Sequence, residues 1–150
     1  MAKWENFTIW RGRFPHWRAD NVEYYASFPH RQILDQDDCD ILFSHLMRSH
    51  GKAVEFLALV VVPEKTEAIF TVGRSSGGDF FELTDVIAKA QRRFMKKAGK
   101  ERAFYSEHFD RIIRDEAERE TLLLGMLNAP STSDAIEAPD NWSALYVAAE

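Results

Sequence analysis

The sequence predicts a single α+β domain whose mostly antiparallel sheet has its helices packed mainly on one face. Its 150 residues suit one domain, and an apolar share of 45% is enough for a sizeable core. Residues 53–72 read as two strands around a short polar turn that begins at Pro63. Strands joined by so short a turn pair antiparallel, and their alternation with helices elsewhere favours the α+β class.

The start of the chain predicts an extension followed by one strand. Residues 1–20 form the extension, in which large aromatic side chains alternate with basic ones, and Pro15 prevents one uninterrupted helix. We interpret this extension as tucked against the sheet, because so many rings are costly to leave in water. Residues 22–28 predict a strand, since they are rich in β-branched and aromatic residues, and Pro29 ends it.

Two helices follow from capping signals and apolar spacing. One is expected to begin at Asp35, because acidic residues suit the positive end of a helix dipole, and to stop at Gly51. The clearer helix covers 82–98, with apolar residues three and four apart, Thr84 as a candidate cap and Gly99 as its stop. The other expected elements are strands at 53–62, 67–72, 103–105 and 109–113, a helix at 115–127, and an acidic C-terminal tail at 130–150.

Charge is unevenly distributed along the chain. Residues 115–150 hold eight acidic residues and one basic residue, a net charge of −7. The whole chain has a net charge of −5, so residues 1–114 have a net charge of +2. An anionic partner is therefore expected to meet the first three quarters of the chain.

The compartment is expected to be the cytoplasm. Cys39 is the single cysteine, which cannot form an internal disulfide. No apolar run approaches the roughly 20 residues of a membrane helix, and the first residues lack the apolar centre of a signal peptide. We therefore expect no membrane partner.

Several local patterns occur in the order that one known family shows. They are residues 12–17, 22–28, Val62-Pro63, the basic helix at 82–98, Phe104, 110–116, 128–130 and 141–143. Together they resemble the single-tyrosine transposases, in particular the branch of REP-associated tyrosine transposases, over nearly the whole chain. The segment at 110–116 is the most specific of these patterns.

This resemblance implies a ferredoxin-like sheet and an enzyme that cuts and rejoins single-stranded DNA, often beside a hairpin. In the family a tyrosine attacks the phosphodiester, and a divalent metal held by a His-hydrophobe-His pair polarises the phosphate. Two side chains at i and i+2 of a strand point to one face, so both can reach one ion. The ion then offsets charge that develops on the phosphate oxygens.

The residues at the family's reactive positions differ in this sequence. They are Lys65 and Glu67 for the histidine pair, Gly125 for the tyrosine and Ala129 for the supporting asparagine. A shift of one residue restores Asn128 but places Leu124 at the tyrosine position. Because all four groups are replaced together, we interpret the chain as catalytically inactive. We expect no cofactor, and Mg or Mn only if activity is retained.

Other candidates for chemistry have simpler interpretations. His108, Asp110 and Glu67 are weak candidates for a metal site, since two ligands without a third rarely define one. We interpret Lys65 and Glu67 as ordinary charges in a solvent-exposed turn. The remaining histidines, which show no metal spacing, are His16, His30, His45 and His50. The four tyrosines, which packing explains and which have no evident activating partner, are Tyr24, Tyr25, Tyr105 and Tyr146.

Basic side chains supply the candidate DNA contacts. They are Lys89, Arg92, Arg93, Lys96, Lys97, Lys100, Arg111, Arg114, Arg11 and Arg13. Cations favour a helix C-terminus, which explains part of the stripe at 89–102, but the stripe exceeds that need and suits phosphate contact. Arg111 and Arg114 stand beside acidic residues and are equally suited to surface ion pairs.

The sequence thus favours a transposase-like domain that binds single-stranded or hairpin DNA without catalysis, as a monomer or a homodimer. One alternative is a protein-interaction or structural module that has lost DNA binding, as the acidic last quarter suggests. Another is an active metal-dependent transposase or nuclease with relocated residues. The three interpretations differ in whether DNA is bound and whether it is cut.

Overall fold

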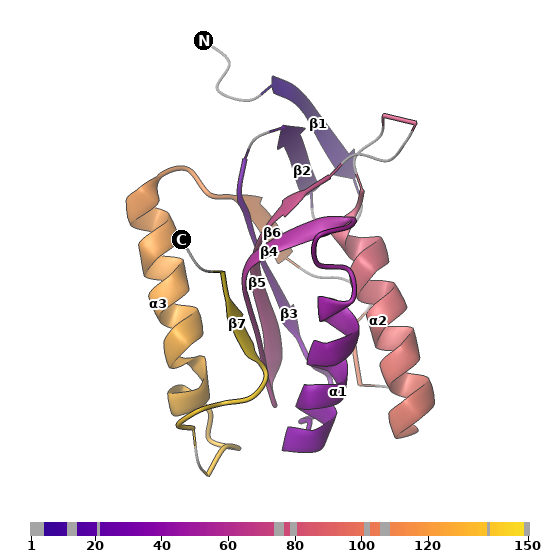
Figure 1. Ribbon diagram of the computed structural model, residues 1–150, viewed down its shortest axis with the longest axis vertical. Helices are drawn as coiled ribbons and strands as arrows, with labels where there is room; N and C mark the ends of the chain where they lie inside the picture. Colours follow the sequence, from indigo (N-terminus) through magenta and orange to yellow (C-terminus); the bar gives the residue numbers. More distant parts are fainter. Residues whose placement is uncertain are drawn as a thin grey trace.

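The computed structural model describes residues 22–73, 77–78, 81–100, 103–105, 109–137 and 139–148, and the backbone of 5–11 and 15–20. The helices and strands in chain order are β1 (Glu5–Arg11), β2 (Pro15–Asp20), β3 (Tyr24–Pro29), α1 (Gln36–Met47), β4 (Val54–Val62), β5 (Lys65–Val72), α2 (Leu83–Ala98), β6 (Phe109–Ile112), α3 (Glu116–Thr132) and β7 (Leu145–Val147). The strands β1 and β2 form a separate antiparallel hairpin within the predicted extension, beside the main sheet (Figure 1).

The main sheet has five strands in the order β6-β3-β5-β4-β7, and every neighbouring pair is antiparallel. The helix α1 links β3 to β4, and α2 links β5 to β6, which is a ferredoxin-like arrangement. Figure 1 shows α1 and α2 on one face of the sheet and α3 on the other. The predicted α+β class is confirmed, with two of the three helices in the described residues on the same face.

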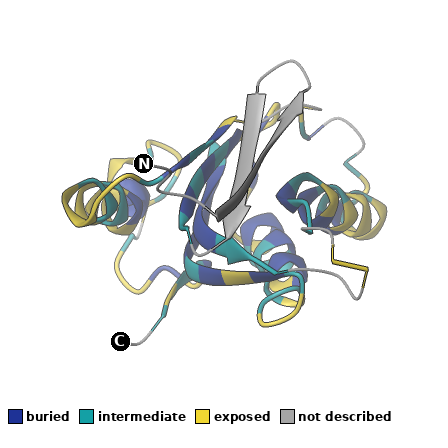
Figure 2. Ribbon diagram, turned by 90° about the horizontal axis from the view of Figure 1, so that it is seen from above, coloured by how far each residue is buried: buried dark blue, intermediate teal, exposed yellow. Residues whose placement is uncertain are grey.

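The core lies between the sheet and the helices, and its centre is β4 and β5. Every residue from Ala58 to Val62 is buried, because helices cover both faces of these central strands. Tyr24 of β3 stacks on Phe70 of β5 with ring centroids 5.4 Å apart. Exposed residues lie on the outer sides of α2 and α3 and in the loops (Figure 2).

Two helix ends match the capping signals, and two do not. The Asp35 side chain accepts a hydrogen bond from the Asp38 amide, and Gly99 ends α2 with φ +70°. The helix α1 ends at Met47, because the chain turns through Gly51 at φ +79° into β4. Thr84 does not cap α2, whose N-cap is Glu82 without a side-chain hydrogen bond.

The segment after residue 127 is more regular than predicted. The helix α3 continues through Pro130 to Thr132, and beyond the proline the Ser133 amide bonds the Ala129 carbonyl. In the predicted tail, Leu145–Val147 adds an edge strand to β4. The Trp142 Nε1–H donates to the Val61 carbonyl at 2.8 Å, and this bond holds the segment before β7 against β4.

Candidate functional site

The turn between β4 and β5 is shorter than the sequence indicated. Val62 pairs with Lys65, so only Pro63 and Glu64 form the turn. Lys65 and Glu67 are therefore strand residues, two positions apart and on one face, as the resemblance required of the histidine pair. Glu67 is only 6% exposed, so the prediction of an ordinary solvent-exposed charge was wrong for this residue.

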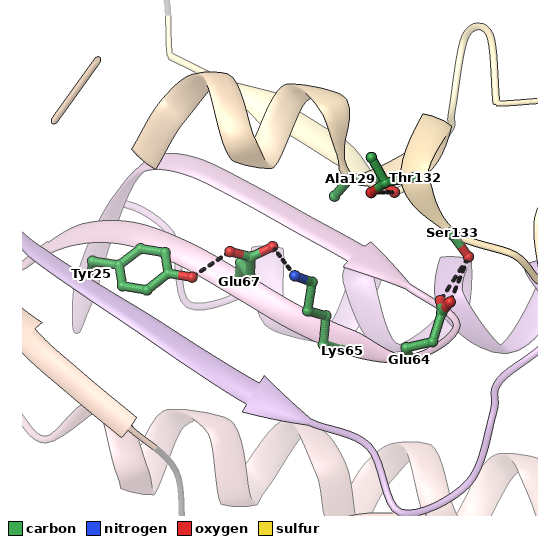
Figure 3. Close-up of polar contacts among 7 residues, drawn as sticks. All are labelled: Tyr25, Glu64, Lys65, Glu67, Ala129, Thr132 and Ser133. Carbon is green, nitrogen blue, oxygen red and sulfur yellow. Dashed lines mark hydrogen bonds and ion pairs between the residues drawn. The ribbon is translucent and has the colours of Figure 1, made fainter. Parts of the chain in front are cut away.

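Lys65, Glu67 and Tyr25 form one connected polar group beneath α3 (Figure 3). The Lys65 ammonium lies 3.1 Å from one oxygen of the Glu67 carboxylate. The Tyr25 hydroxyl donates to the other oxygen. One oxygen of the buried carboxylate thus accepts a hydrogen bond, and the other has an ion-pair partner but no hydrogen bond.

This environment makes Tyr25 a poor nucleophile. Burial, followed by the neighbouring Glu67 carboxylate, raises the pKa of the Tyr25 hydroxyl well above its usual range. An attacking tyrosine needs the opposite, a phenolate that forms readily. The hydrogen bond between Tyr25 and Glu67 could not be predicted from the sequence, because the two residues are 42 positions apart and meet only through the pairing of β3 with β5.

The residues of this group do not fit a divalent metal. The Glu67 carboxylate is already bound by an ammonium group, which has no free electron pair, and by a phenol. Asp110 is opposite Ala26 in the sheet, whereas Glu67 is opposite Ser27, so Asp110 and Glu67 point to opposite faces. They cannot share an ion, and His108 lies outside the described residues.

The two family positions on α3 differ in their surroundings. A Cβ atom at Gly125 would meet no atom within 4 Å, so the tyrosine position is open to solvent. Ala129 is buried, 3% exposed. Just beyond the helix, the Ser133 hydroxyl lies 2.7 and 2.9 Å from the two carboxylate oxygens of Glu64 (Figure 3). The helix end is thereby tied to the β4–β5 turn by a group that the sequence analysis did not identify.

His30 holds the same turn from the opposite face of the sheet. Its Nδ1–H donates to the Pro63 carbonyl at 3.0 Å, since a carbonyl can only accept, and its Nε2 accepts from the Thr66 hydroxyl at 2.8 Å. The His30 amide also bonds the Glu64 carbonyl at 2.8 Å. Burial lowers the pKa of His30 to about 4, so the imidazole is neutral near pH 7.

Two of the predicted DNA contacts have partners inside the protein. Lys100 forms an ion pair with Asp38, and Arg111, which is opposite Tyr25 in the sheet, forms one with Glu118 of α3. Arg114 is exposed. The side chain of Arg11 and the whole of Arg13 lie outside the described residues.

The rest of the predicted stripe forms a basic face on α2, defined by Lys89, Arg92, Arg93, Lys96 and Lys97. All are exposed, and none forms an ion pair with another described residue. Burial lowers the pKa of His45 on α1, and the nearby positive charges of Arg48, Lys97 and Arg93 lower it further. This face is on the side of the sheet opposite the acid-rich α3 (Figure 1).

The fold is similar to that of a solved REP-associated tyrosine transposase bound to a REP hairpin. The TM-score is 0.68, the sequence identity is 12%, and the match covers 90% of this chain and 82% of that one. No family model and no curated protein matches the sequence. The predicted resemblance is therefore supported as a likeness of fold.

The described residues include neither a cluster of metal ligands nor a membrane-spanning helix. No group of three or more histidine, cysteine, aspartate or glutamate side chains is arranged to hold a metal ion there. In that same part of the chain, no helix combines the length and the apolar character needed to cross a membrane.

Proposed function

We propose that this chain is a nucleic-acid-binding domain that has the fold of a tyrosine transposase without strand-transfer chemistry. The observation that supports binding most strongly is the basic face of α2, whose five side chains have no ion-pair partner among the described residues. The expected ligand is single-stranded or hairpin DNA, because the structurally similar transposase is bound to a hairpin.

The proposed loss of strand-transfer catalysis is supported by the polar group of Lys65, Glu67 and Tyr25 beneath α3. A lysine and a glutamate neutralise one another at the positions of the expected histidine pair, and Gly125 has no side chain to attack phosphorus. The acidic first turn of α3 also repels phosphate from this side of the sheet. The basic face of α2 and the family's reactive positions thus lie on opposite faces of the sheet.

Binding through the α2 face has a specific salt dependence. Each phosphate that a cation neutralises on a single strand adds about 0.7 to the slope of log K against log salt concentration. A variant with both Arg92→Gln and Lys96→Gln removes two exposed cations one helical turn apart. We expect this variant to bind a labelled single strand and a labelled hairpin more weakly, as measured by fluorescence anisotropy. For the single strand, the slope of log K against log salt concentration should be smaller by about 1.4.

The matched control is Arg31→Gln, which removes an exposed cation next to Tyr105 that is not a residue of α2. It should leave affinity and slope close to the parent values. Absence of binding at micromolar protein and low salt would contradict the proposal and favour a protein-interaction or structural module. Equal slopes for the parent and the α2 variant would also count against it.

An alternative function requires the Glu67 carboxylate to accept the proton of the Tyr25 hydroxyl, although burial and this same carboxylate raise the pKa of that hydroxyl. This alternative is a metal-dependent transposase or nuclease that uses Tyr25 as a relocated nucleophile. Incubation of labelled hairpin DNA with the protein and Mg²⁺ or Mn²⁺ distinguishes the two. We expect no covalent adduct, whereas an adduct that Tyr25→Phe abolishes would establish the alternative.

A further inference from the structure

A cleft of about 650 Å³ lies at one end of the α1–α2 pair, where it adjoins the basic face of α2. Four basic residues line it, from three separate elements: Arg48 at the end of α1, Lys52 in the turn before β4, and Lys89 with Arg93 on α2. Among the described residues that line this cleft, none is acidic. Its volume is in the range of a small-molecule site.

The backbone around this cleft is closely fitted. The Gly73 amide bonds the Ala53 carbonyl at 3.0 Å, and the Phe81 amide bonds the Gly73 carbonyl at 2.9 Å. A Cβ at Gly73 would lie 3.4 Å from the Lys52 carbonyl oxygen and 3.8 Å from the Phe81 ring. Gly73 therefore lies in contact with both the turn that bears Lys52 and Phe81.

The four cations suit a doubly charged anion. Lys89 and Arg93 are four residues apart and share one side of α2, facing Arg48 and Lys52 across the cleft. Such a concentration of positive charge exceeds the need of a phosphodiester, which has one negative charge. A phosphomonoester has a charge of about −1.5 to −2 at pH 7 and three strong acceptor oxygens. Arginine and lysine donors bind such oxygens by charge-assisted hydrogen bonds.

We propose that this cleft binds a phosphomonoester, the terminal phosphate of a nucleic-acid strand or of a free nucleotide. Phe81, which is partly exposed, supplies an aromatic surface against which the attached base or sugar packs. The strand form of this proposal rests on the proposed function, because the α2 face continues from Lys89 and Arg93 along the helix. Burial is the largest cause of the lowered pKa of His45, and the charges of Arg48 and Arg93 contribute to it.

The test compares five ligands, three single strands of one sequence and two mononucleoside competitors. They are a single strand with a 5′-hydroxyl, the same strand with a 5′-phosphate, the same strand with a 3′-phosphate, and thymidine 5′-monophosphate against thymidine. We expect a terminal phosphate to strengthen binding about tenfold, as a charge-assisted hydrogen bond network would. Lys52→Gln should remove that advantage while binding of the 5′-hydroxyl strand persists, because Lys52 is not part of the α2 face. Arg31→Gln should preserve the advantage.

Each outcome decides the inference separately from the proposed function. A preference for one phosphorylated end, or for both, supports the cleft as the site of a strand terminus. Binding of the monophosphate without binding of any strand supports the cleft and overturns the proposed function. Equal affinity for phosphorylated and unphosphorylated ligands, or a phosphate advantage that survives in Lys52→Gln, overturns the inference, even if strand binding through α2 persists.

Discussion

Stability below pH 7 should depend on His30. The imidazole is buried between the Pro63 carbonyl and the Thr66 hydroxyl, and Nε2 must be unprotonated to accept from Thr66. Burial lowers the pKa from 6.5 to about 4 and outweighs the Pro63 carbonyl and Glu64 carboxylate, which act in the opposite direction. Each pKa unit corresponds to about 1.4 kcal/mol, so this difference corresponds to about 3 kcal/mol.

The direction of this pH dependence follows from whether the folded or the unfolded state binds the proton more tightly. Between pH 6.5 and about 4 the unfolded chain is protonated at His30 while the folded chain is not. The free energy of unfolding should therefore be at its full value above pH 6.5 and fall progressively as the pH is lowered to about 4. This loss is large beside the 5–15 kcal/mol that is typical of whole domains.

The assay is urea denaturation at several pH values from 7 to 4, followed by tryptophan fluorescence, for the parent protein and His30→Gln. Glutamine keeps a polar amide near Pro63 and Thr66 but does not titrate. The parent should lose about 3 kcal/mol more than the variant across this range, whatever their difference at pH 7. The same pH dependence in both proteins would refute the argument.

Three substitutions test the local geometry by thermal or urea denaturation. Gly99→Ala should destabilise by about 1 kcal/mol, because its φ of +70° disfavours a Cβ, whereas Gly125→Ala should stabilise by about 0.5–1 kcal/mol, because it lies inside α3 with open space around it. Equal effects at these two glycines would contradict the backbone assignment. Trp142→Phe should cost about 1 kcal/mol by removing the donor to the Val61 carbonyl, and no change would show that β7 does not depend on that bond.

The features that the sequence predicted correctly have local signals. The helix α2 has apolar residues at helical spacing and a glycine at its end, and Asp35 stands where a capping side chain is needed. The antiparallel hairpin followed from one short turn between two apolar segments. These features depend on residues within a few positions of one another, so one sequence is enough to identify them.

The features that it missed depend on pairing between distant segments. The contact between Tyr25 and Glu67 follows from the register of β3 against β5, and a shift of one residue would turn Glu67 to the other face. The strand β7 has three residues, too few for a pattern. The basic cleft combines Arg48 and Lys52 with α2, and no spacing along the chain brings these residues together.

The central claim is that nucleic acid meets the α2 side of the sheet and not the group beneath α3. Titration of the ¹⁵N-labelled protein with an unlabelled 5′-phosphorylated single strand, followed by amide chemical shifts, tests it most directly. We expect the largest changes in amide chemical shift in α2 and in the turn around Lys52. Shifts confined to α3 and to the amides of Tyr25, Lys65 and Glu67 would contradict it.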